Sequence, residues 1–288
     1  MKSNALTRII ILSITIVILL GILLWGMSFD GFSFSPVSIS IGDSDMKDAN
    51  VAARGEEVHV DASKVKDLDI LWVAGNITVQ PGDVEDIVFS ESGVRDERYA
   101  MVWKQTGSKL TIQFCKNSVS EINLDDTLTK DLTITVPRDW TCNGLDVDAA
   151  AANVDVNDLI IREVDIDGAS GECDFRNCDV GTIDLDTASG DVKFYGSLQE
   201  LDCDAASASF YAELTNVPTR IDMDSMSGDL DITLPADSGF SVSMDAMSGD
   251  FSSDFETTIR NGSYVHGDGA CRIDFDGMSG DLNIRKGN

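Results

Sequence analysis

The chain is built around a twelve-residue phrase that occurs eight times, most clearly at residues 183–194, which read IDLDTASGDVKF. Apolar and polar residues alternate on both sides of a Ser-Gly pair, as expected for two β-strands joined at a tight corner. The other copies begin at Leu68, Leu145, Val164, Leu201, Ile221, Val242 and Ile273. A period of roughly 20 residues predicts a solenoid, because a unit this small buries its apolar face only by stacking on its neighbours.

Comparison of the eight copies, position by position, predicts which side chains form the core. Positions 1, 3 and 10 of the phrase are apolar in every copy. Residues two apart share one face of a strand, so positions 1 and 3 point inward on the first strand and position 10 points inward on the second. We therefore predict an all-β fold, a single-stack parallel β-solenoid with one continuous apolar core.

Position 8 of the phrase is always Gly or Ala, which predicts a corner where a larger side chain would clash or where φ is positive. The glycines at this position are Gly75, Gly171, Gly190, Gly228, Gly249 and Gly280. Position 6 holds small residues or methionine, and the methionines are Met226, Met247 and Met278. We interpret the side chains at position 6 as filling the core at the corner.

Two segments depart from the phrase. Residues 84–90, 99–104 and 110–114 alternate like strands without matching it, and they predict a small antiparallel meander near the start of the solenoid. Residues 131–137 (DLTITVP) then match the second half of a later copy, so the chain re-enters the stack there. From Leu145 the copies follow one another, and the last step carries an insertion at residues 254–270.

Positions 2 and 4 of the phrase are almost always aspartate, although aspartate is a poor strand former. Because these positions alternate with core positions, we expect two outward-facing rows of carboxylates, with neighbours about 4.8 Å apart. One interpretation is a cation-binding face, for which Ca²⁺ is the best-suited ion. The candidate residues are Asp165, Asp167, Asp184, Asp186, Asp202, Asp204, Asp222, Asp224, Asp274 and Asp276. The other interpretation is a solubilising face that prevents lateral strand pairing, which is favoured because no complete calcium-loop pattern occurs.

The charge balance restricts the class of partner. The chain has 21 Lys and Arg against 50 Asp and Glu, which gives a net charge of −29. Nucleic-acid binding needs a basic surface, so a nucleic-acid partner is not expected. Docking on anionic lipid headgroups is disfavoured for the same reason, whereas cations and basic polymers are favoured.

The N-terminus carries a localisation signal. Residues 9–27 are nearly continuous apolar sequence, preceded by Lys2 and Arg8 and followed by no basic residue until Lys47. This predicts a transmembrane helix in the lipid bilayer, with a cytoplasmic N-terminus at residues 1–8. A cleaved signal peptide is the alternative, but no small-residue cleavage site follows the apolar run. Residues 28–66 then form a juxtamembrane connector, and residues 67–288 an extracytoplasmic solenoid.

The six cysteines offer either disulfides or buried thiols. Cys173 and Cys203 fall at core positions of the phrase, where a small buried apolar residue is expected. A bond between Cys173 and Cys178, or between neighbouring copies, remains open. No Cys-x-x-Cys spacing supports a zinc site, and we expect no cofactor.

No catalytic motif is present. The sequence lacks a nucleophile elbow, a P-loop and a His-Glu-x-x-His motif. The only histidines, His59 and His266, fall in segments expected to be a connector and an insertion loop. Because some parallel β-helices cleave polysaccharides with acidic residues, a polysaccharide-active enzyme is the alternative to a non-catalytic role.

The repeated Ser-Gly-Asp phrases, such as residues 188–191, 226–229, 247–250 and 278–284, resemble the LiaG-like family of candidate adhesins. These are bacterial β-strand-repeat domains of unknown function, often found behind one membrane anchor. The resemblance covers residues 68–288 and implies a β-solenoid on the outside of a bacterial cell, without catalytic residues. We therefore expect a non-catalytic surface-binding module, or an envelope-stress accessory protein with a membrane or envelope protein partner.

Overall fold

The computed structural model describes residues 46, 48–53, 55–93, 96–116 and 129–287. These residues contain two short 3₁₀ helices, η2 (Ala62–Lys64) and η3 (Glu97–Tyr99), and otherwise regular structure that is all β. No helix in these ranges is long and apolar enough to cross a membrane, and the apolar segment 9–27 lies outside them. The prediction of an all-β, largely parallel stack is confirmed.

The strands fall into three groups along the chain. The first group is β1 (Asn50–Val51), β2 (Val58–Val60), β3 (Asp67–Gly82), β4 (Ile87–Ser92), β5 (Val102–Thr106), β6 (Lys109–Gln113) and β7 (Asp131–Pro137). The second is β8 (Thr141–Asn157), β9 (Ile160–Ser170), β10 (Cys173–Ser189), β11 (Val192–Ser207), β12 (Phe210–Leu214), β13 (Arg220–Ser227) and β14 (Leu230–Leu234). The third is β15 (Phe240–Ala246), β16 (Phe251–Ser253), β17 (Thr258–Arg260), β18 (Ser263–His266), β19 (Cys271–Ser279) and β20 (Leu282–Lys286).

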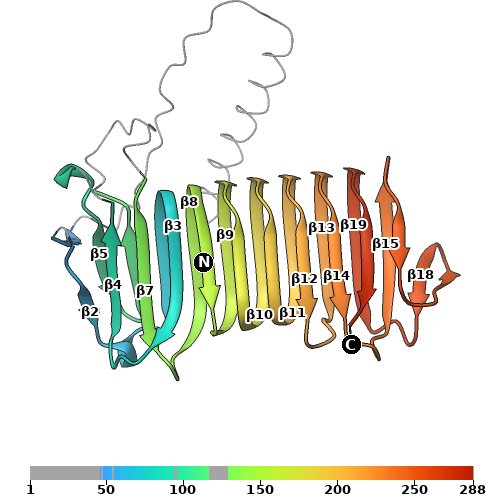
Figure 1. Cartoon of the computed structure of the whole chain (residues 1–288), viewed down its shortest axis with the longest axis horizontal. Helices are drawn as coiled ribbons and strands as arrows, with labels where there is room; N and C mark the ends of the chain where they lie inside the picture. Colours follow the sequence, from blue (N-terminus) through green and yellow to red (C-terminus); the bar gives the residue numbers. More distant parts are fainter. Residues whose placement is uncertain (1–45, 47, 54, 94–95, 117–128, 288) are drawn as a thin grey trace, which may run out of the picture. The chain divides into compact units, whose positions relative to one another are not determined.

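Each copy of the phrase forms one rung of the stack, and Figure 1 shows the rungs side by side. Neighbouring rungs pair in parallel and in register, so Asp184 of β10 pairs with Asp165 of β9 on one side and Asp202 of β11 on the other. The residues at positions 1, 3 and 10 are buried in one continuous core, with the exception of the half-buried Met244 and Phe251. The alternation of apolar and polar residues therefore predicts correctly which side chains face inward.

The rungs do not stack in chain order at the C-terminal end. Strand β13 pairs with β19, and β19 pairs with β15. The last copy of the phrase, which begins at Ile273, therefore lies between the copies that begin at Ile221 and Val242. The insertion at residues 254–270 explains this order, because its strand β18 runs antiparallel to β15 and returns the chain toward the stack.

The N-terminal end of the stack has a similar arrangement. Strand β3 lies between β8 on one side and the pair β6 and β7 on the other. Strand β6 supplies the first half of an outermost rung and β7 the second half, so β6 belongs to the parallel stack rather than to a separate meander. The antiparallel pairs β5–β6, β4–β7 and β2–β4 complete this cap. Capping covers strand edges that would otherwise be open for pairing.

Part of the predicted connector belongs to the core. Val58, Val60 and Val65 fall within residues 28–66, and all three are buried in the hydrophobic core. Strand β2 pairs with β4, which makes it an edge strand of the cap. The hydrophobic core therefore includes residues that precede the first copy of the phrase.

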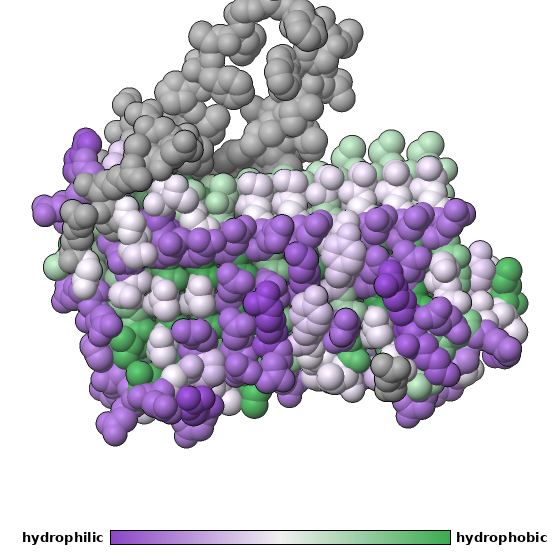
Figure 2. Space-filling view, viewed as in Figure 1, coloured by the Kyte–Doolittle hydropathy of each residue, from purple (hydrophilic) through white to green (hydrophobic). Residues whose placement is uncertain are grey.

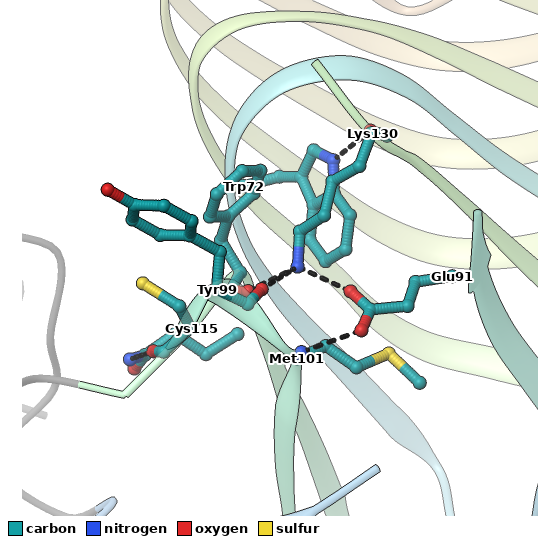
Figure 3. Close-up of polar contacts among 8 residues, drawn as sticks. Trp72, Glu91, Tyr99, Met101, Cys115 and Lys130 are labelled. Carbon is teal, nitrogen blue, oxygen red and sulfur yellow. Dashed lines mark hydrogen bonds and ion pairs between the residues drawn. The ribbon is translucent and has the colours of Figure 1, made fainter. Parts of the chain in front are cut away.

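A buried ion pair lies inside the N-terminal cap (Figure 3). Lys130 Nζ contacts Glu91 Oε2, and both side chains are almost fully buried. The ammonium also donates to the carbonyl oxygens of Tyr99, at 2.7 Å, and of Phe114. Glu91 Oε1 accepts from the backbone N–H of Met101 at 2.9 Å. Burial lowers the pKa of Lys130 to about 8, although the Glu91 carboxylate opposes the shift.

The ion pair replaces the glycine corner of the outermost rung. Residue 130 takes the place of position 8, since Asp131 and Leu132 continue in register with Asn76 and Ile77 of β3. Its ammonium lies 4.6 Å from the ring centre of Trp72, whose indole N–H donates to the Lys130 carbonyl oxygen at 2.9 Å. These contacts join β3 and β4 to the residue directly before β7, at the corner of the outermost rung.

The position 8 glycines lie at the corners that join the two strands of each rung. Gly190 has a φ of +125°, a region that residues with a side chain rarely adopt. A Cβ added to Gly190 would lie less than 3.0 Å from the carbonyl oxygen of Gly171 in the neighbouring rung. The same close approach to a neighbouring carbonyl occurs at Gly75, Gly171, Gly228, Gly249 and Gly280. Where glycine stands at the corner, a side chain is excluded because neighbouring rungs approach each other through their backbones. Ala152, Ala208 and Lys130 stand at the corners of the remaining rungs.

Candidate functional site

Two rows of aspartate run along one face of the stack. The row at position 2 contains, in spatial order, Asp69, Asp146, Asp165, Asp184, Asp202, Asp222 and Asp274. The row at position 4 contains Asp148, Asp167, Asp186, Asp204, Asp224, Asp276 and Asp245. All ten candidate residues lie in these rows, which we call the acidic face.

The rung order keeps the position 2 row unbroken. In chain order, Ser243 would interrupt the position 2 row between Asp222 and Asp274. In the structure Asp274 pairs directly with Asp222, and Ser243 follows as the terminal member. The insertion of the last copy therefore makes the seven aspartates at position 2 consecutive, whereas the seven at position 4 would be consecutive in either order.

Basic side chains approach the position 2 row at its two ends. Lys109 contacts Asp69 at 2.5 Å at one end, and Arg272 contacts Asp274 at 2.5 Å at the other. Arg220 contacts both Asp222 and, at 3.4 Å, Asp202. Both arginines stand directly before position 1 of their rungs, so each reaches over the residue at position 2.

Ionisation is unfavourable at four aspartates of the acidic face. Burial and then the neighbouring aspartates raise the pKa of Asp146 and of Asp148 to about 7. The same two causes raise the pKa of Asp204 and of Asp224. Like charges in adjacent rungs disfavour each other's charged form, so a cationic partner would relieve a real electrostatic cost.

The carboxylates of the acidic face are not arranged around a common centre. No group of three or more His, Cys, Asp or Glu side chains in the described ranges is arranged to hold a metal ion. Each rung presents its two carboxylates in the same direction as its neighbours, whereas Ca²⁺ takes six to eight oxygen ligands around it. The geometry provides a continuous field of negative charge rather than a chelating cage.

A family model described as Toastrack DUF4097 matches residues 37–285 of the chain. The chain belongs to the Toastrack DUF4097 family. The match includes the cap strands β1 and β2 as well as every copy of the phrase. No curated protein matches the sequence.

Several solved structures resemble this Toastrack domain at low identity. A candidate cell adhesion protein from Clostridium sporogenes is 9% identical, covers 81% of this chain and 99% of its own, and has a TM-score of 0.38. A candidate adhesin from Bacteroides fragilis is 17% identical, covers 80% of this chain and 97% of its own, and has a TM-score of 0.46. A candidate lipid-binding protein from Parabacteroides distasonis is 12% identical, covers 83% of this chain and 98% of its own, and has a TM-score of 0.27. Similarities this weak add nothing to the assignment of function.

The histidines of this Toastrack domain lie at opposite ends of the stack. His59 is in β2 of the N-terminal cap. His266 is in β18 of the C-terminal cap, where its ring packs against Phe240 and its Nδ1 lies 2.7 Å from the Glu256 carbonyl oxygen. A cavity of about 10 Å³ at the corner of β8 to β11 has room for about one water molecule. None of these features brings an acid, a base and a substrate cavity together.

All six cysteines of the Toastrack domain are buried free thiols. Neither the Cys173–Cys178 bond nor a bond between rungs is formed. Burial raises the pKa of Cys173 and of Cys203 to about 12, which keeps both thiols protonated. These residues act as small apolar parts of the core.

The interpretation of position 6 is wrong for the methionines. Met226, Met278 and Met247 are 51%, 52% and 84% exposed, so they do not fill the core. They lie in three consecutive rungs, because β19 pairs with both β13 and β15. Figure 2 shows hydrophobic side chains projecting beyond one edge of the stack. We call these three residues the methionine row, and chain order alone does not show that Met278 lies between the other two.

The aspartate of the Ser-Gly-Asp phrase, at position 9, has a structural role that the sequence did not reveal. The Asp229 carboxylate accepts a hydrogen bond from the backbone N–H of Asp281 at 2.9 Å. The Asp281 carboxylate accepts one from the backbone N–H of Asp250, also at 2.9 Å. Each of these side chains thus holds the next rung at the corner, where the parallel ladder is interrupted.

Proposed function

We propose that this chain is a non-catalytic binding module of the bacterial cell surface, anchored in the membrane by residues 9–27. Its acidic face would bind basic partners through the combined field of both aspartate rows. The observation that carries the proposal is the pair of unbroken rows, with seven aspartates each in register. The repeated Ser-Gly-Asp phrases support the finer placement among LiaG-like members of the family.

The linear charge density of the acidic face supports a polycationic partner. Two carboxylates per rung, with rungs about 4.8 Å apart, place about one carboxylate per 2.4 Å, against about one charge per 1.7 Å along double-stranded DNA. Pairs with Lys109, Arg220 and Arg272 and the raised pKa of Asp146 and Asp148 make the net charge density lower than this. A polyanion of this density retains counterions, and a polycation that displaces them binds with a steep dependence on salt. A nucleic-acid partner would be repelled by the same field.

The proposal favours diffuse binding over chelated Ca²⁺ and over catalysis. The carboxylates stand in parallel rows rather than around a common centre, which supports attraction of extended cationic partners. A polysaccharide-active enzyme has less support, because the two histidines lie in separate caps.

The location rests on sequence features outside the described residues. The apolar run at residues 9–27 is long enough to span the hydrocarbon core, and Lys2 and Arg8 precede it. By the positive-inside rule these residues support a cytoplasmic N-terminus and a stack outside the membrane. A membrane or envelope protein with a basic surface would then meet the acidic face from the same side of the bilayer.

One experiment tests the orientation and the acidic face together. The full chain is expressed, and right-side-out and inside-out membrane vesicles are titrated with a fluorescent oligolysine peptide at several salt concentrations. We expect binding to right-side-out vesicles, with a logarithm of affinity that falls linearly with the logarithm of salt. The test variant carries Asp165→Asn, Asp167→Asn, Asp184→Asn and Asp186→Asn, and we expect about tenfold weaker binding and a shallower slope.

The control variant removes the same charge elsewhere, through Asp139→Asn, Asp179→Asn, Asp237→Asn and Glu213→Gln, at exposed sites away from the rows. It is expected to bind nearly as well as the natural chain. Equal losses in both variants would mean that only net charge matters and would overturn the role of the acidic face. Binding confined to inside-out vesicles would overturn the proposed orientation and leave that role intact.

A further inference from the structure

The methionine row is the largest apolar feature exposed in consecutive rungs of the described structure. Large apolar side chains are usually buried, and exposed ones that gather in a patch commonly mark an interaction site. The in-register pairs on either side, Ser225 with Gly277 and Ser227 with Ser279, place Met226 beside Met278. Met247 donates its backbone N–H to the Gly277 carbonyl oxygen at 3.2 Å, which places it on the other side of Met278.

Carboxylates border the methionine row on both sides. Two residues before each methionine stands an exposed aspartate of the position 4 row, and three residues after it stands an aspartate at position 9. The first border is Asp224, Asp276 and Asp245, and the second is Asp229, Asp281 and Asp250. None of these six carboxylates forms an ion pair with another residue in the described ranges.

Smaller apolar side chains continue the methionine row into the neighbouring rungs. Position 6 in the preceding rungs is alanine, at Ala206, Ala188, Ala169 and Ala150. Ala169 is exposed and the other three are half-buried. An apolar line therefore extends over seven consecutive rungs, and its three methionines stand at one end. The position 4 aspartates border it throughout, whereas position 9 in the added rungs is acidic at Glu172 and Asp191 but not at Asn153 and Ser209.

We propose that the methionine row docks a basic amphipathic segment of a partner protein, with the partner's apolar side chains on the methionines and its Lys and Arg on the acidic borders. This inference rests on the proposed function and names the place and the partner chemistry. Methionine side chains are flexible and polarisable, so they adapt to varied apolar surfaces. Complementary charge at the borders adds association rate and orientation, and an apolar stripe with basic flanks is a recurring recognition mode for helices.

The charge of the borders selects this occupant over other apolar ligands. An anionic lipid surface would bring like charges against Asp224, Asp276 and Asp245, and a second copy of this chain would do the same with its own borders. A purely apolar segment would leave the six border carboxylates without a cationic partner. A segment that carries both apolar and basic side chains satisfies both parts of the surface.

The test uses the full chain in zwitterionic lipid nanodiscs, with the signal from empty nanodiscs subtracted. Two peptides of equal length and charge are titrated, one an amphipathic Leu–Lys peptide and the other a Ser–Lys peptide. The variant carries Met226→Ser, Met278→Ser and Met247→Ser. We expect it to bind the Leu–Lys peptide about tenfold more weakly than the natural chain does, with Ser–Lys binding unchanged.

A matched control removes three exposed apolar side chains elsewhere, through Ile160→Ser, Ile259→Ser and Val51→Ser, which are 58%, 71% and 46% exposed. It is expected to bind both peptides like the natural chain. Methyl NMR of the methionines supplies a second readout, in which the Leu–Lys peptide shifts the signals of the methionine row and not that of buried Met101. Unchanged Leu–Lys affinity in the methionine variant would overturn the inference, whereas failure of both peptides to bind the natural chain would overturn the proposed function as well.

Discussion

Replacing Gly190 with alanine is expected to destabilise the stack by about 3 kcal/mol or more. The new Cβ would lie less than 3.0 Å from the Gly171 carbonyl oxygen, a backbone atom that cannot move without shifting the neighbouring rung. The φ of +125° adds conformational strain for any residue with a side chain. Chemical denaturation of the natural and variant chains measures the difference in the free energy of unfolding.

Gly262→Ala separates the two causes of this loss. Gly262 also has a positive φ, at +90°, but a Cβ added there would meet no atom within 4 Å. Its replacement is expected to cost only about 1 kcal/mol, from strain alone. Equal losses at Gly190 and Gly262 would show that the close approach of the rungs does not determine the choice of residue at the corner.

Replacing Glu91 with alanine is expected to destabilise the protein by about 3–5 kcal/mol, because it leaves the Lys130 ammonium buried without its counter-charge. The side chains of Lys130 and Glu91 are only 2% and 1% exposed. Two backbone carbonyls would still accept hydrogen bonds from the ammonium, but neither carries a neutralising charge. Chemical denaturation gives the change, and recovery in the double variant Glu91→Leu, Lys130→Met would identify the unpaired charge as its cause.

The exposed pair of Arg138 with Asp83 supplies the control. Its side chains are 66% and 87% exposed, and surface pairs of this kind contribute at most about 1 kcal/mol. Asp83→Ala is therefore expected to have little effect. A loss at Glu91 no larger than the loss at Asp83 would contradict a structural role for the buried pair.

Local sequence pattern was sufficient to predict the inward and outward faces of the rungs. Apolar residues such as Ile183 and Leu185 alternate with Asp184 and Asp186, and the parallel in-register ladder then aligns like residues in rows. The small residue at position 8 was interpreted equally well, since few physical causes other than a tight corner exclude side chains larger than that of alanine. The acidic rows followed from these two features.

The order of the rungs could not be read from the phrase, because every copy presents nearly the same edge to a neighbour. The loops decide which copies meet, and the strand β18 in the insertion returns the last copy between β13 and β15. The direction of Met226 was missed for a related reason. The residue at position 6 precedes the corner, where the backbone leaves the regular strand alternation.

The ion pair of Lys130 and Glu91 in the N-terminal cap could not be predicted, because the repeated phrase is interrupted there. Lys130 stands at a corner that glycine or alanine occupies in the other rungs, but the long segment between Gln113 and Lys130 removes the spacing that would have revealed the match. Glu91 lies in a strand that does not belong to any copy of the phrase. No periodic pattern therefore connects the two residues before the fold is known.

The rung order makes the position 2 row unbroken and places Met278 between Met226 and Met247, and cysteine crosslinking tests this order most directly. Neighbouring rungs lie about 4.8 Å apart, within disulfide reach, whereas rungs two steps apart lie about 9.6 Å apart, beyond it. Two double variants are oxidised, one with Met226→Cys and Met278→Cys and the other with Met226→Cys and Met247→Cys. The pair Met278→Cys with Met247→Cys bonds in either order and serves as the positive control. The structure predicts a bond between positions 226 and 278 and none between 226 and 247; a bond between 226 and 247 without one between 226 and 278 would contradict it.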